Sequence, residues 1–179
     1  MTTRTRIGLV GIALSASICA AGAQQAEAPA GNPLDVIPDK MPFNIPYGAP
    51  ISLARAQAAI GAAMAEAEKR GWALNVAVVD AGGNLVAFGR MDGAQLASIS
   101  ISEHKARASA TFRRPTKAFE DAIQRSDYKY VLSLDGVIAS RGGIPLVEDG
   151  KLIGAIGCSG AAGSQDEAAC KVGAGTINK

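Results

Sequence analysis

The hydrophobic pattern of the chain begins with a clear helical period and then changes to strands. Apolar residues recur at helical spacing over residues 53–67, after Ser52, which can cap a helix, and before Gly71, which can end one. The stretches 74–80 and 85–90 are apolar and are joined by a short turn sequence rich in glycine. This half of the pattern predicts a helix followed by a β-hairpin.

A second helical pattern runs from residue 94 to about residue 110. The Pro115-Thr116 pair interrupts the pattern, and a short helix is expected over residues 117–124, with Thr116 as its cap. The segment 126–143 has no clear period. One face of the longer helix is predicted to carry Ala97, Ile101, His104 and Ala108.

A second hairpin and a closing helix complete the pattern. Strands are expected at 144–148 and 151–159, joined by a tight Asp149-Gly150 turn. A glycine-rich bend then leads into a helix over residues 164–174. The order of elements predicts an α+β domain in which two hairpins share one antiparallel sheet flanked by helices.

The N-terminal end has the three parts of an export signal. Arg4 and Arg6 precede an uncharged apolar run at 7–21, and Ala21-Gly22-Ala23 is a small-x-small cleavage site. The apolar run is shorter than the roughly 20 residues of a membrane-spanning helix. We therefore expect residues 1–23 to be a cleavable signal peptide, no stable membrane span, and a periplasmic or secreted protein.

Residues 24–50 carry a proline at about every fourth position, which excludes helix and interior strand. We expect an extended arm here and a single domain over residues 51–179. Apolar residues alternate along the arm and would dock on the domain or on a neighbouring subunit. These residues are Met41, Phe43, Ile45 and Tyr47.

The charge balance changes when the signal is removed. The chain has 18 Lys and Arg against 16 Asp and Glu, and Arg4 and Arg6 leave with the signal. The remaining 16 charges of each sign give a neutral mature chain. Nothing in this balance indicates a surface that follows phosphates, so we expect no nucleic-acid partner.

Two cysteines remain after cleavage, Cys158 and Cys170. We favour two small buried hydrophobic residues; the alternative is a disulfide, which export permits and which needs Cα atoms within about 7 Å. The chain has no CxxCH sequence, which excludes covalent attachment of c-type haem. One histidine and two cysteines are too few for an ordinary structural zinc site.

Several short motifs, taken together and in order, resemble the GlcG/HbpS-like proteins, also called haem-degrading or haem-binding domains. They cover roughly residues 51–177. The motifs are Val78-Val79-Asp80-Ala81-Gly82-Gly83-Asn84-Leu85, Arg90-Met91-Asp92-Gly93-Ala94, Lys105-Ala106-Arg107, Phe112-Arg113-Arg114-Pro115-Thr116, Gly142-Gly143-Ile144-Pro145-Leu146, Gly154-Ala155-Ile156-Gly157-Cys158-Ser159-Gly160 and Gln165-Asp166-Glu167.

The resemblance implies a profilin-like or PAS-like domain with three layers and a central antiparallel sheet. It also implies a homo-oligomer, a hexamer or an octamer built of dimers. Some members of the family bind haem, and one secreted member is a redox-responsive partner of a sensor kinase. Haem is therefore the cofactor that the resemblance implies.

The only histidine, His104, is the sole imidazole that could ligate haem iron. Its alternative role is a partly buried, hydrogen-bonded residue at an interface. Arg90, Lys105 and Arg107 could hold a carboxylate such as a haem propionate, or could form ion pairs, Arg90 with Asp92 for example. Glycine-rich bends could present N–H groups to an anion, or could simply permit tight turns. The candidate ligand-binding residues are Arg90, Asp92, His104, Lys105, Arg107, Thr116, Gly142, Gly143, Ser159 and Gly160.

The sequence thus predicts an exported homo-oligomer that binds haem or another small ligand in a pocket between subunits. Two alternatives remain open. One is an enzyme acting on a small organic acid or aldehyde, with Lys105 or His104 as the acid or base. The other is a redox- or ligand-sensing accessory protein. The sequence identifies no catalytic residue.

Overall fold

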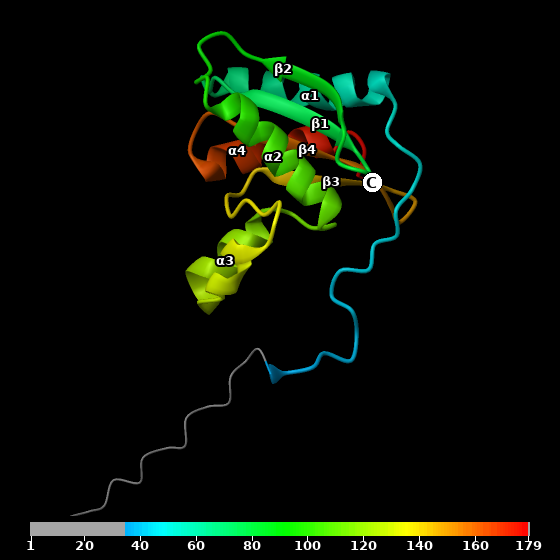
Figure 1. Ribbon diagram of the computed structural model, residues 1–179. Coiled ribbons are helices and arrows are strands. Elements are labelled where there is room, and N and C mark those ends of the chain that lie inside the picture. Colours follow the sequence, from blue (N-terminus) through cyan, green and yellow to red (C-terminus); the bar gives the residue numbers. More distant parts are fainter. Residues whose placement is uncertain (1–34, 179) are drawn as a thin grey trace, which may run out of the picture. The chain divides into compact units, whose positions relative to one another are not determined.

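In the computed structural model, which describes residues 35–178, four antiparallel strands form one sheet in the order β2–β1–β4–β3 (Figure 1). The first hairpin consists of β1 (Asn75–Asp80) and β2 (Leu85–Arg90), and the second of β3 (Gly143–Glu148) and β4 (Lys151–Ser159). The inner strands β1 and β4 pair with each other. The two predicted hairpins therefore share one sheet.

Helices cover both faces of this sheet (Figure 1). On one face lie α1 (Leu53–Lys69) and α4 (Gly163–Ala174), which also contact each other; α2 (Ser98–Thr111) covers the other face. The shorter α3 (Lys117–Ser126) and the 3-10 helix η2 (Lys129–Ser133) follow α2. The predicted α+β fold with a central antiparallel sheet between helices is confirmed.

The two faces of β1 show why its sequence is apolar without alternation. Val76 and Val78 belong to the core beneath α1 and α4. Ala77 and Val79 point the opposite way and pack with Ala106 of α2. A strand buried on both faces has no solvent side, so polar residues do not interrupt it.

Small residues allow α2 to lie directly on the sheet. A Cβ atom at Gly157 would stand 2.2 Å from the carbonyl oxygen of Ser102, so only glycine fits there.

The helix α2 begins at Ser98 rather than at residue 94, and its buried face carries Ser98, Ser102 and Lys105. The face predicted to be buried is a different one: His104, which lies on it, is only half-buried. Hydrophobic periodicity missed the true buried face because that face is made of serine, alanine and one lysine.

Two predicted helix caps do not form. The Ser52 and Thr116 side chains make no capping hydrogen bond to α1 or α3. The hydroxyl of Thr116 instead accepts a hydrogen bond from the backbone N–H of Gly143, at 2.9 Å. Thr116 therefore joins the start of α3 to the start of β3.

A disulfide joins Cys158 of β4 to Cys170 of α4, with their Cα atoms 5.7 Å apart. Our preferred interpretation of two unpaired cysteines was wrong, and the alternative was right. Apolar burial was correctly expected, since both residues are fully buried in the core. The bond ties the closing helix to an inner strand.

The described unit that contains the domain extends back to Lys40, before the predicted boundary. Backbone hydrogen bonds join Gly48 to Leu152 and Ile51 to Ile153. The hydroxyl of Tyr47 donates to the carbonyl of Thr111 at 3.0 Å. This part of the arm docks on its own domain. The predicted signal at 1–23 and the arm up to residue 34 lie outside the described residues.

Candidate functional site

Lys105 and Asp166 form a buried ion pair at the end of β4. The Lys105 ammonium lies 2.9 Å from the Asp166 carboxylate and donates to the carbonyl of Cys158 at 3.2 Å. Their side chains are 1% and 3% exposed. The other carboxylate oxygen accepts from the N–H of Ala161. Burial raises the pKa of Asp166 above its usual value, and Lys105 opposes that rise.

The glycines beside this pair are required by close packing. A Cβ at Gly143 would stand 2.3 Å from the Lys105 carbonyl oxygen, and Gly142 has φ +120°, which favours glycine. Gly160, with φ +152°, packs against the carbonyl of Ala73 in the same way. The ammonium is already neutralised and enclosed, so the arrangement is that of a structural centre rather than an open anion site.

Six predicted site residues are thus brought together around the ion pair. Ser159 is buried among them, and its hydroxyl lies 3.1 Å from that of Ser98. The ion pair between Lys105 and Asp166 was not predicted from the sequence, in which the two residues lie 61 positions apart. The six residues are Lys105, Thr116, Gly142, Gly143, Ser159 and Gly160.

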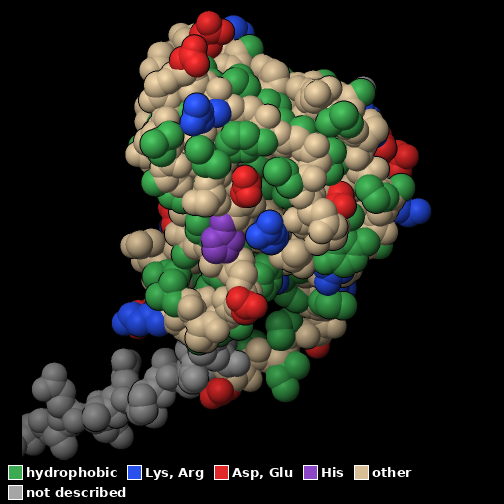
Figure 2. Space-filling model, turned by 45° about the horizontal axis from the view of Figure 1, so that its top comes forward, with side chains coloured by type: hydrophobic (Ala, Val, Ile, Leu, Met, Phe, Trp, Pro, Cys, Tyr) green, Lys and Arg blue, Asp and Glu red, His purple; other side chains and the backbone are tan. Residues whose placement is uncertain are grey.

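His104 and Arg107 occupy a separate, open groove on the outer face of α2. This groove has a volume of about 440 Å³ and is also lined by Ser100, Glu103, Asp135 and Gly136. In Figure 2 the histidine side chain lies at the surface beside basic and acidic side chains. Nε2 of His104 is 3.2 Å from the carbonyl oxygen of Gly136. With the proton on Nε2, that nitrogen donates to the carbonyl and Nδ1 keeps a free lone pair.

Arg90 and Asp92 lie elsewhere, in a hollow of about 640 Å³ between β2 and α1. Its other lining residues include Met64 and Glu68 of α1. Both predicted residues are exposed, and no ion pair joins them within residues 35–178. The ten predicted residues therefore occupy three separate places.

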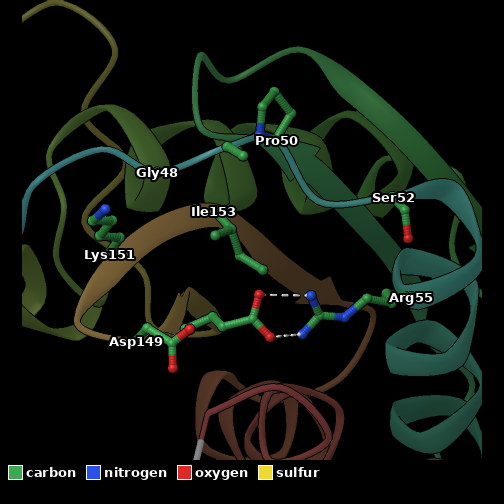
Figure 3. A pocket seen from close by; sticks show the side chains of 9 residues that line it. Gly48, Pro50, Ser52, Arg55, Asp149, Lys151 and Ile153 are labelled. Atoms are coloured by element: carbon green, nitrogen blue, oxygen red, sulfur yellow. Dashed lines mark hydrogen bonds and ion pairs between the residues drawn. The ribbon is translucent and has the colours of Figure 1, made fainter.

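A further pocket of about 400 Å³ lies between the docked arm, α1 and the β3–β4 turn (Figure 3). The Arg55 guanidinium extends across it and forms a bidentate ion pair with the Glu148 carboxylate, with N···O distances of 2.9 and 2.6 Å. Arg55 and Glu148 therefore neutralise each other across this pocket, which Asp149 and Lys151 also line.

Two kinds of feature do not occur among the described residues. No cluster of three or more His, Cys, Asp or Glu side chains that could hold a metal ion occurs between residues 35 and 178. Over the same range, none of the helices combines the length and the apolar character that crossing a membrane requires.

Sequence comparison finds relatives over most of the domain. Protein GlcG of Escherichia coli is 38% identical over 109 residues, which are 61% of this chain and 81% of GlcG. An uncharacterised protein of Citrobacter freundii is 36% identical over 121 residues, 66% of this chain and 85% of its own length. The alignments therefore include most of each relative.

Solved structures share the fold. HbpS of Streptomyces reticuli superposes with a TM-score of 0.68 at 28% identity, covering 84% of this chain and all of that one. The Klebsiella pneumoniae protein ORFY gives the same score and identity, over 79% and 97% of the two chains. A PduOC–haem complex has a TM-score of 0.65 at 26% identity, over 73% and 96%.

A family model for the HbpS-like haem-degrading proteins matches residues 51–175, which include every helix and strand from α1 to α4. The match includes both hairpins, the buried ion pair and the His104 groove. It agrees with the relatives and with the superposed structures. The chain belongs to the family of HbpS-like haem-degrading proteins.

Proposed function

We propose that this protein binds haem, or another small ligand carrying a carboxylate, in the groove formed by His104 and Arg107. The observation that supports this most is the contact of His104 Nε2 with the Gly136 carbonyl, at 3.2 Å. Metal-ligating histidines commonly donate their second ring N–H to a carbonyl in this way, which fixes the ring and frees the other nitrogen.

The groove offers the two groups that haem needs from a protein. Haem iron takes an imidazole ligand, and His104 would supply it. A propionate takes a guanidinium, and Arg107, one turn further along α2, lines the same groove. Haem itself supplies the redox-active iron. The PduOC–haem complex, a structural neighbour, adds support for this choice of ligand.

Apolar walls for a macrocycle are scarce in the groove of one chain, which is lined mainly by polar residues. Exposed leucines precede its lining residues in the sequence: Leu96 before α2, and Leu132 and Leu134 just before Asp135, with exposures of 71%, 66% and 41%. Such side chains favour cover by another subunit. We include a homo-oligomer, with the pocket at a subunit interface, in the proposal.

Export is the third part of the proposal. It depends on the signal pattern of residues 1–23, and the Cys158–Cys170 disulfide supports it, because disulfides persist in oxidising compartments. An intact mass that lacks residues 1–23, measured on protein from the extracytoplasmic fraction, is the expected result. A full-length mass in the cytoplasmic fraction would contradict it.

Hemin titration tests the ligand. Tag-free mature protein should shift the Soret band in a saturable way, His104→Ala should abolish the shift, and added imidazole should restore it. Arg107→Gln should weaken binding, whereas Arg125→Gln, an exposed arginine of α3, should not. The proposal fails if wild-type protein leaves the spectrum unchanged, or if His104→Ala binds as the wild type does.

The enzymatic alternative finds no support at Lys105. The ammonium is buried, ion-paired and bonded to a carbonyl, so no substrate reaches it in this conformation. A general acid or base must lie within hydrogen-bond reach of the substrate. Of Lys105 and His104, only His104 lines an open groove that a substrate could enter.

A further inference from the structure

A further cavity lies between α3, η2 and the docked arm. It has a volume of about 360 Å³. This size is at the lower end of the range for ligand pockets, about 300–1,000 Å³, and suits a small molecule rather than a macrocycle. Its walls are aromatic and aliphatic side chains: Phe43, Phe112, Ala118, Phe119, Ala122, Tyr128, Tyr130, Val131 and Leu134.

One cation, Arg114, lies among these apolar walls. Its guanidinium carbon is 3.2 Å from the centre of the Phe43 ring and 5.4 Å from that of Phe119. Its Nε donates to the carbonyl of Phe112 at 3.1 Å. The two terminal nitrogens have no hydrogen-bond partner within residues 35–178, and no carboxylate of that range pairs with them.

Arg114 differs in its partners from the other partly buried arginines, of which Arg113 donates to the carbonyl of Ile45 at 3.1 Å. Arg55 and Arg141 are also partly buried, and each has a glutamate partner, Glu148 and Glu120. Burial lowers the pKa of Arg114, because desolvation disfavours the charged form and the neighbouring Arg113 adds a like charge. Withdrawing a cation from water without a counter-ion is unfavourable, so a bound anion would relieve this cost.

We infer that this cavity binds a small carboxylate with an aromatic or compact apolar body. The carboxylate pairs with the terminal nitrogens of Arg114, and the apolar body lies between the rings of the cavity wall. Arginine favours bidentate hydrogen bonding to a planar carboxylate. Phe43, which comes from the docked arm, covers the guanidinium as a lid.

Benzoate is the probe for this site, and two partial probes separate its features. Acetate keeps the charge without the ring, and benzyl alcohol keeps the ring without the charge. By calorimetry and ligand-observed NMR on the mature protein, benzoate should bind saturably. Each partial probe should bind at least about tenfold more weakly, because each lacks one of the two interactions. Equal binding of benzoate and benzyl alcohol, or no saturable benzoate binding, would overturn the inference.

Variants locate the site. Arg114→Gln should weaken benzoate binding about tenfold or more, by loss of a charge-assisted pair. Phe43→Ala should weaken it by a smaller factor, and the exposed Arg125→Gln should leave it unchanged. Unaltered affinity in a folded Arg114→Gln protein would refute the assignment.

Chemical protection in wild-type protein covers the case in which Arg114→Gln does not fold. Benzoate should slow modification of Arg114 by phenylglyoxal and leave Arg125 unprotected; equal rates would contradict the inference. If benzoate does not bind and Arg114→Gln changes the oligomer's mass, the cavity is a subunit interface instead. Hemin binding through His104 is measured separately, so the outcome of either test does not decide the other.

Discussion

The buried ion pair gives the sharpest prediction about stability. Lys105→Met removes the ammonium while keeping a long apolar side chain in its place. The Asp166 carboxylate, 3% exposed, then keeps the N–H of Ala161 but loses its counter-ion. Removing one partner of a buried pair typically destabilises a protein by about 3–5 kcal/mol. We expect a loss of that size at neutral pH.

The loss should depend on pH in a defined direction. Burial already raises the pKa of Asp166 in the folded protein, and without Lys105 the rise is larger. A raised carboxyl pKa means that the native state keeps a proton that the unfolded state has released. Stability therefore falls as pH rises above the ordinary carboxyl value of 3.8. The variant should approach wild-type stability as the solution becomes acidic.

Urea unfolding at fixed protein concentration, at about pH 4.5 and about pH 7.5, measures this difference. The deficit of Lys105→Met relative to wild type should be clearly larger at the higher pH. Lys117→Met is the matched control, because its pair with Asp121 is partly exposed, and its midpoint should change little. Equal deficits at the two pH values, or a deficit below about 1 kcal/mol, would refute the account of this pair.

Three further predictions concern packing and the disulfide. Cys158→Ala/Cys170→Ala should lower stability by about 3 kcal/mol in urea unfolding, as expected for a closed loop of this length. Gly157→Ala should cost about 1–3 kcal/mol or more, since its Cβ would meet the Ser102 carbonyl. Gly61→Ala, with no atom within 4 Å of a Cβ in α1, should instead stabilise the protein by about 0.5–1 kcal/mol, measured as a raised Tm.

The sequence predicted the order and type of the principal elements because local signals agree along most of the chain. The turn at Asp149-Gly150 and the apolar strands around it needed no tertiary information. The start of α2 was misplaced, and its buried face was missed. That face depends on Gly143 and Gly157 of distant strands, which allow serine and lysine to approach the sheet. Hydrophobic periodicity contains no signal for such a contact.

The candidate site was harder to predict for a related reason. Lys105 was selected as a free cation, but its partner Asp166 comes from α4, and only the fold brings the two together. Arg114 was not among the candidate ligand-binding residues. Its aromatic surroundings come from the arm, α3 and η2, which are separate in the sequence. His104 was selected as a candidate because it is the only histidine in the sequence.

The central claim is that His104 is the haem-binding residue, and its being the only histidine makes a direct measurement available. Tag-free protein labelled with isotopes in histidine alone gives one set of imidazole NMR signals. Adding hemin should broaden or shift these signals stoichiometrically, through contact with the paramagnetic iron. If hemin binds, as judged by its absorbance, and the imidazole signals stay unchanged, then haem lies elsewhere and the claim is wrong.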